Sequence, residues 1–351
     1  MRNYGTRGYS GYRGRRPSGK RWVVFFLVLI LLAAAASLVA QHYMVYDMDG
    51  TYHIELPWLR RASNVQKPAL HGARQDLEIV IEQPDAPPVV PLHAQELDPS
   101  ALSGTVSRTL KALPKDVNAV AVRLKTANGD LLYPSALPAA AEANAVAGDK
   151  SVSGAIRNLT DSGYYTIARL SALHDSRFAP AHKSDAAVQQ KAYKGELWYA
   201  PDSTFYLAPE KELTRQYLAS IAAEVASLGF DELLFDEFGY PANGRLYNIK
   251  TDEREMTQEQ ALALLADNLR EMVRDSGTKL SLVMDEKTVL AGSDAKTGQD
   301  LSLLAVRFDR IYVPTTEEKV PELLEALAPY TAELVPILDT APAEGVYLIS
   351  Q

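Results

Sequence analysis

A helix, a tight turn and a short strand that ends in acidic residues follow one another over residues 213–241. Apolar residues recur there at helical spacing: Leu213, Tyr217, Ile221, Val225 and Leu228. Gly229 stands where many helices end in a left-handed residue. The next apolar run, 233–235, lies between acids and is stopped by Gly239 and Pro241. Such a run is typical of a buried strand, so we expect it to carry carboxylates to its C-terminal end.

Strand-like and helix-like segments alternate from residue 117 to the C-terminus. The strand-like runs are 117–124, 164–172, 232–235, 280–284, 310–313, 334–338 and 346–349. Helical patterns lie between most of them, and Thr257 with Gln260 forms a capping box at the start of one. This alternation predicts parallel strands joined by helices, in a barrel or a doubly wound sheet.

The number of predicted strands and the loop after the first strand indicate which α/β fold forms. No glycine-rich phosphate loop follows the first predicted strand, which argues against a dinucleotide fold and favours a TIM-like (β/α) barrel. The seven predicted strands are one short of a closed barrel. Either a further strand at 77–81 completes it, or the barrel is incomplete or degenerate.

The N-terminus has the pattern of a membrane protein. Residues 1–21 carry seven basic and no acidic residues, and we interpret them as a disordered cytoplasmic tail. Residues 22–40 contain no charge and are long enough to span a bilayer. Because basic residues beside a span stay in the cytoplasm, everything after Gln41 should lie outside, as in a single-pass protein of the cell membrane. A cleaved secretory signal is the alternative.

Between the span and the barrel, residues 43–56 alternate around Asp49-Gly50, which predicts a small hairpin. Residues 57–91 are irregular and rich in proline, as in a stalk. The predicted domains are therefore the tail at 1–21, the transmembrane helix at 22–40, the hairpin and stalk at 41–92 and the barrel at 93–351.

Charge and cysteine content exclude several classes of function. Removing the seven basic residues of the tail from the 36 in the chain leaves 29 against 44 acidic residues, a net charge of −15. We therefore expect no nucleic-acid partner. No cysteine occurs, which excludes disulfides, thiolate metal sites and Cys nucleophiles. The serines lack a Gly-x-Ser-x-Gly turn and the histidines lack ligand spacing, so we predict no Ser-His-Asp hydrolase, no metal and no cofactor.

Several segments resemble, in order, those of a bacterial family of glycoside-hydrolase-like proteins with a TIM barrel. GFDELLFDEFGYP at 229–241 is similar to the family pattern GFDEIQFDYIRFP. VNAVAVRLK at 117–125 and YTIARL at 165–170 resemble NAVVIDVKDDxGxVxY and YxIARIVxFKD, and 298–301 and 309–314 resemble GQxLE and DYISPMVYPS. The resemblance implies a barrel that acts on carbohydrate, with Asp236 at the position of the family's catalytic Asp.

The chain also departs from the family pattern at several polar positions. The acid of the first strand is Arg123, the acidic pair after the Lys is Thr126-Ala127, and the motif's Tyr and Arg are Glu237 and Gly239. Because glycoside hydrolysis uses a pair of carboxyl groups, these changes leave two alternatives open. One is an active hydrolase of a surface or environmental polysaccharide, and the other is an inactive barrel that binds cell-wall glycan or a partner protein.

Four acids are candidates for the catalytic pair, which must lie about 5 to 9.5 Å apart. Asp236 ends its strand and is the leading candidate. Glu237 faces the opposite side of the strand and points inward only if the chain turns. Asp285 and Glu286 close the following strand and are the remaining candidates. The acids before the strand, Asp231 and Glu232, are expected in a turn exposed to solvent.

Six further residues are predicted to contact substrate. Arg123 and Arg169 lie inside apolar strand patterns, where an unpaired cation is unfavourable, so each should pair with an acid, Arg123 with Asp236 itself. The others are Lys125, Asp175, Trp198 and Tyr312. Trp198 and its neighbour Tyr199 have rings that suit a sugar face, although a core role is the alternative.

Overall fold

The computed structural model describes residues 44–46, 52–54, 91–193, 195–251 and 254–350. The chain divides into two compact units, Met1–Glu82 and Gln83–Gln351. In the first unit, β1 (Met44–Tyr46) pairs antiparallel with β2 (Tyr52–Ile54), which confirms the predicted hairpin. The predicted tail, transmembrane helix and 77–81 strand lie outside the described residues. No helix in the described ranges is long and apolar enough to cross a membrane.

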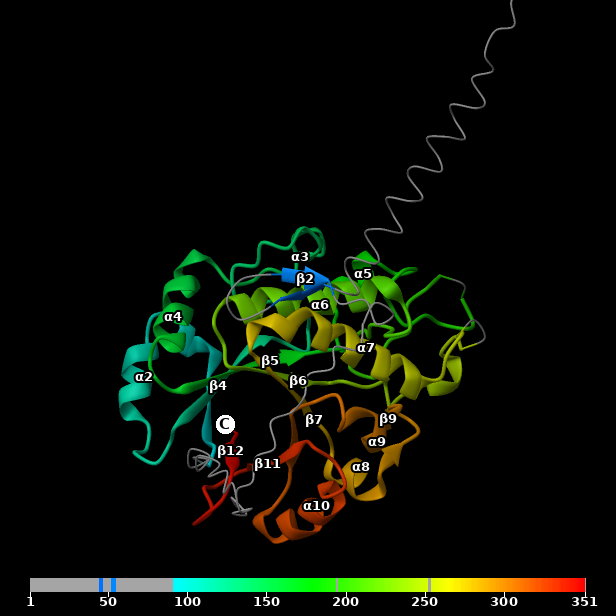
Figure 1. The fold of residues 1–351 in the computed structure, drawn as a ribbon. Coiled ribbons are helices and arrows are strands. Elements are labelled where there is room, and N and C mark those ends of the chain that lie inside the picture. The colour runs from blue at the N-terminus through cyan, green and yellow to red at the C-terminus, as the bar shows by residue number, and fades with distance from the viewer. Residues whose placement is uncertain (1–43, 47–51, 55–90, 194, 252–253, 351) are drawn as a thin grey trace, which may run out of the picture. The chain divides into compact units, whose positions relative to one another are not determined.

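The second unit contains a closed barrel of eight parallel strands, visible in Figure 1. In order around the barrel they are β3 (His93–Leu97), β4 (Ala119–Lys125), β5 (Tyr165–Ser171), β6 (Glu232–Asp236), β7 (Lys279–Val283), β10 (Arg310–Pro314), β11 (Glu333–Leu338) and β12 (Tyr347–Ile349). All seven predicted strands are present. Both alternatives for the missing strand, an incomplete or degenerate barrel and closure by a strand at 77–81, are wrong, because β3 pairs with both β12 and β4 and closes the sheet.

Helices cover the outside of the barrel. The longer ones are α2 (Val106–Ala112), α4 (Lys150–Thr160), α6 (Glu212–Ser227), α7 (Gln258–Val273) and α10 (Val320–Leu327). Short helical segments fill the connections: α3 (Pro138–Glu142), α5 (Phe178–Ala181), α8 (Glu286–Ala291), α9 (Leu301–Leu304), η2 (Pro99–Ser103), η3 (Leu246–Asn248), η4 (Arg274–Ser276) and η5 (Glu317–Lys319). The small strands β8 (Ser293–Asp294) and β9 (Gln299–Asp300) form a hairpin.

The predicted start and end signals of the helices are confirmed. Both hydrogen bonds of the capping box form between Thr257 and Gln260 at the start of α7. Gly229, just beyond α6, has φ +92°, a conformation that side chains with a Cβ rarely adopt. The chain can therefore leave α6 and enter β6 within a few residues.

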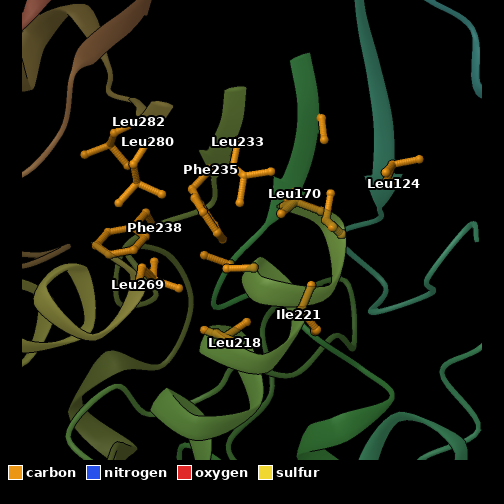
Figure 2. Packing of buried hydrophobic residues seen from close by; sticks show 14 of the residues in the cluster. Leu124, Leu170, Leu218, Ile221, Leu233, Phe235, Phe238, Leu269, Leu280 and Leu282 are labelled. Atoms are coloured by element: carbon orange, nitrogen blue, oxygen red, sulfur yellow. The ribbon is translucent and has the colours of Figure 1, made fainter. Parts of the chain in front are cut away.

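Alternation along each strand separates two apolar cores. Leu233 and Phe235 of β6 point outward and pack with Leu218 of α6 and Leu269 of α7 in the large cluster between sheet and helices (Figure 2). The intervening Leu234 belongs to a smaller cluster inside the barrel. Asp236, two residues further on, therefore points into the barrel interior as well.

At the opposite end of the interior, Glu232 is fully buried, which corrects its expected exposure. Its Oε2 accepts hydrogen bonds from the Tyr165 hydroxyl at 2.9 Å and from Arg310 at 2.5 Å. Arg310 also pairs with the exposed Glu333 at 2.9 Å. One arginine thus neutralises an acid that faces the inside of the barrel, where solvent is absent.

Arg310→Met should lower the free energy of unfolding by about 3–5 kcal/mol, because it leaves Glu232 charged and buried without its cation. Urea unfolding of the purified protein measures this value. Glu333→Gln removes the exposed partner of the same arginine and should change stability by about 0–1 kcal/mol. Equal, small effects of the two substitutions would show that the buried pair does not support the fold.

Candidate active site

The mouth, where the C-terminal ends of the barrel strands meet, is organised around Asp236. Its Oδ2 lies 2.7 Å from Nε of Arg169 and 2.9 Å from an Nη of Arg123. The pairing predicted for both arginines is therefore confirmed. The other oxygen, Oδ1, is buried and has no hydrogen-bond partner among the described residues. Two guanidinium groups thus hold one oxygen of this carboxylate.

Glu96 is a member of this cluster that the sequence did not indicate. Arg169 reaches it with Nη1 at 2.8 Å, so the ion pairs run from Glu96 through Arg169 and Asp236 to Arg123. The four side chains come from the neighbouring strands β3, β4, β5 and β6. The arginines are direct neighbours across β4 and β5, so two like charges meet there and need both acids.

Glu237 reaches the mouth because the chain turns immediately after β6. Its φ is +50°, an unusual value for a residue with a Cβ, and its side chain lines the same cavity as Asp236. Burial raises the pKa of Glu237, and the neighbouring Asp236 charge raises it further. Of the two consecutive acids, one is therefore held by two arginines and the other has a raised pKa.

Contacts from the β8–β9 hairpin hold this turn in place. Tyr240 N donates to the Thr297 carbonyl at 2.8 Å, and Gln299 Nε2 donates to the Phe238 carbonyl at 3.1 Å. A Cβ on Gly239 would lie 3.0 Å from Cβ of Thr297. A larger residue at position 239 would therefore require the Thr297 side chain to shift by a few tenths of an ångström.

A cavity of about 530 Å³ opens over these residues, and Arg123, Arg169, Asp236, Glu237 and Asp285 line it. Asp285 is exposed at the start of α8 and also lines an adjoining cavity of about 790 Å³. Glu286 lies only in the adjoining cavity, where it accepts a hydrogen bond from Thr315 at 2.6 Å. Three of the four predicted acids thus share the main cavity.

Tyr206 closes one side of the cavity and stacks on His174, with ring centroids 4.6 Å apart. His174 Nε2 lies 2.5 Å from the hydroxyl of Thr204, which donates to Asp202 at 2.6 Å. Burial raises the pKa of Tyr206 to about 12, and the Glu237 carboxylate contributes to this shift. Tyr206 therefore remains an uncharged hydroxyl at neutral pH.

Lys125 and Asp175 lie away from the cavity, which corrects their predicted contact with substrate. The register between β4 and β5 shifts between Arg123 and Lys125, and such an irregularity redirects the side chain that follows it. Lys125 Nζ lies 2.8 Å from Asp175 Oδ2, and both side chains are fully buried. Asp175 also accepts hydrogen bonds from the backbone of Arg177 and Phe178. The pair fixes the start of α5.

Trp198 and Tyr312 also lie outside the cavity. Trp198 is buried and donates from Nε1 to the Arg245 carbonyl at 3.0 Å, so its core alternative holds. Tyr312 is fully buried inside the barrel because β10 continues to Pro314. Within the described part of the chain, no three His, Asp or Glu side chains cluster closely enough to hold a metal ion.

Residues 102–314 match a family described as a putative glycosyl hydrolase domain. The chain belongs to this family. The matched range contains Arg123, Arg169, Asp236 and Glu237. It begins at residue 102 and therefore does not include Glu96. No curated protein matches the chain significantly.

The chain is similar to several solved structures at low sequence identity. The glycoside hydrolase domain of PgaB (BpsB) from Bordetella bronchiseptica is 16% identical, with 71% of this chain and 83% of that chain covered and a TM-score of 0.50. A hypothetical protein from Ruminiclostridium thermocellum is 22% identical over 54% of this chain and 96% of its own, with a TM-score of 0.45. A variant of the PelA glycoside hydrolase domain from Pseudomonas aeruginosa is 14% identical over 70% and 83%, with a TM-score of 0.40.

The raised pKa of Glu237 predicts a pH-dependent effect on stability. Because the folded protein binds this proton more tightly than the unfolded chain, ionised Glu237 lowers stability above its unfolded pKa of about 4.3. Glu237→Gln should therefore raise Tm at about pH 7 and leave it unchanged below about pH 4. Calorimetry across this range measures the difference.

Glu142→Gln, at the exposed end of α3, controls for the loss of a surface carboxylate. A Tm difference for Glu237→Gln that is the same at every pH would reflect altered packing and contradict the assigned proton affinity.

Proposed function

We propose that the barrel hydrolyses glycosidic bonds of a polysaccharide or cell-surface glycan bound at the mouth. The observation that carries this proposal is the placement of Asp236 and Glu237 in one cavity, in opposite electrostatic environments. Glycoside hydrolysis requires such a division between a protonated acid and an ionised carboxylate. Membership of the glycosyl hydrolase family supports the same reaction class.

In this mechanism Glu237 acts as the general acid and gives its proton to the oxygen of the departing sugar. Positive charge then develops at the sugar ring, and the Asp236 carboxylate stabilises it. Arg123 and Arg169 both contact Asp236 and fix its orientation. Asp285, which lines the cavity from the end of β7, is the candidate base for the attacking water.

A second function, glycan binding without hydrolysis, is favoured by the double ion pair itself. An Asp236 oxygen engaged by two guanidinium groups is a weaker nucleophile and base than an unpaired one. Arg123 occupies the position where the family pattern has an acid. The same mouth would then hold a sugar through charged hydrogen bonds and release no product.

The location proposed for this activity is the outer side of the cell membrane, with residues 22–40 as a retained anchor. The support is the uncharged stretch of 19 residues and the seven basic residues that precede it. A polymer of the cell surface or surroundings would be accessible to a barrel in this position.

Hydrolysis is tested by incubating the full chain with a panel of neutral, amino and acidic polysaccharides and measuring released reducing sugar. Glu237→Gln and Asp236→Asn should each lower the rate by about 100-fold or more, because each removes one half of the carboxyl pair. Glu286→Gln should retain near-normal activity, since Glu286 lies outside the main cavity.

Product from the native chain that is unaffected by Glu237→Gln would contradict the assigned acid. Binding of a polysaccharide without product would replace the hydrolase with the non-catalytic alternative.

Membrane anchoring predicts that the full chain remains in the membrane fraction after an alkaline carbonate wash, and that protease added outside the membrane cleaves the barrel. Leu29→Arg with Leu31→Arg should abolish insertion, because each charge at the centre of a span costs about 2.5–3.5 kcal/mol. Gel electrophoresis of the fractions measures both results. A shorter, soluble mature chain would show a cleaved signal instead.

A further inference from the structure

Exposed aromatic side chains are concentrated on two neighbouring loops of the barrel. Among the described residues, the large aromatic side chains that are exposed are Tyr193 (67%), Tyr199 (51%) and Tyr247 (83%). Tyr193 and Tyr199 lie in the connection from β5 to α6, and Tyr247 lies in the connection from β6 to α7. Both connections leave the C-terminal ends of their strands, on the side of the mouth.

The two loops share a small apolar core of their own. Val188, Trp198, Ala200, Ala208 and Ile249 make up this core. Hydrogen bonds join the loops next to the exposed rings. Lys191 N donates to the Asn248 carbonyl at 2.7 Å, and Asn248 Nδ2 donates to Gln190 Oε1 at 2.9 Å. Tyr193 and Tyr247 therefore extend from backbone segments that lie side by side.

The same loops also line the main cavity. Tyr206 does so from the first loop, and Ala242 and Asn243 do so from the second. Trp198 connects the two places, since its ring contacts Tyr206 edge-on at 6.1 Å and its Nε1 bonds to the carbonyl of Arg245. The exposed tyrosines thus belong to the structure that forms one wall of the cavity.

The chemistry of this surface suits a sugar chain. A tyrosine ring offers a flat apolar face with a polar edge, as required for stacking on a pyranose. Several residues near the tyrosines in the sequence are polar or charged, among them Lys191, Glu196, Arg245 and Asn248. Exposed aliphatic side chains, which would add to a protein-binding surface, lie elsewhere on the barrel, at Leu290 in α8 and Leu324 in α10.

We propose that Tyr193, Tyr199 and Tyr247 form a stacking platform that binds the polysaccharide outside the cavity and guides its chain to Asp236 and Glu237. This assignment rests on the proposed carbohydrate function and extends it to long polymers. Sugars beyond the cleaved bond would lie on the platform, so the protein would favour a polymer over a short oligosaccharide.

The test uses the full chain carrying Glu237→Gln, so that binding is measured without hydrolysis. The probes are insoluble chitin, cellulose and peptidoglycan, and the readout is depletion of protein from solution. Replacing the three tyrosines with alanine should weaken binding at least about tenfold, because each ring contributes stacking contact. Replacing them with tryptophan should restore binding, because tryptophan keeps an aromatic ring. If the tyrosines acted only through structural hydrogen bonds of their hydroxyls, tryptophan would not restore binding. Met272→Ala with Leu324→Ala removes exposed apolar side chains from α7 and α10 as a control.

Three results would overturn the platform: no binding to any of these polymers, equal binding by the alanine variant, or no recovery with tryptophan. A change in oligomeric state of the alanine variant in sedimentation would also overturn it, because the tyrosines would then contact a second copy. Tyrosine-dependent binding together with no sugar released by the native chain keeps the platform and rejects hydrolysis, so the two proposals fail separately.

Discussion

The ion pairs around Asp236 are the interaction on which the mouth depends. Four charged side chains from adjacent strands lie where an ordinary barrel would hold apolar layers, and their charges balance only as a set. Arg169 is central, because it contacts both Glu96 and Asp236. Without this arrangement the two facing arginines would repel each other, and the ends of β4 and β5 could not approach.

The turn at Glu237 places a second carboxyl group beside this cluster of charges. A strand that continued would direct Glu237 toward the helices, away from Asp236. The positive φ places it over the cavity instead, and contacts from Thr297 and Gln299 hold the turn. Two neighbouring acids thereby lie in one cavity with different partners, and no second strand is needed to separate them. The loops beyond the turn then extend the surface outward to the exposed tyrosines.

The sequence predicted the features that follow from the periodicity of apolar residues and from the unfavourable burial of an unpaired charge. The strand pattern located Asp236, and the unfavourable burial of a lone cation correctly predicted that Arg123 pairs with it and that Arg169 pairs with an acid. His93–Leu97 was missed because it is short, polar and adjacent to a proline-rich stretch, so it has little apolar signal. Lys125 was wrongly assigned to the substrate site because a register shift between strands arises only in the folded structure. Trp198 was wrongly assigned because a loop sequence has no periodicity that distinguishes a buried ring from an exposed one. The contact between Glu96 and Arg169 could not be predicted, because it forms only when the barrel closes.

A crystal structure of the Glu237→Gln protein with a long oligosaccharide tests the central claim most directly. It should show a sugar ring in the cavity within hydrogen-bond distance of Asp236, with the glycosidic oxygen next to the amide that replaces the Glu237 carboxyl. Arg123 and Arg169 should still contact Asp236. A sugar bound elsewhere on the barrel, or an Asp236 that leaves its arginines and makes no contact with the ligand, would contradict the account.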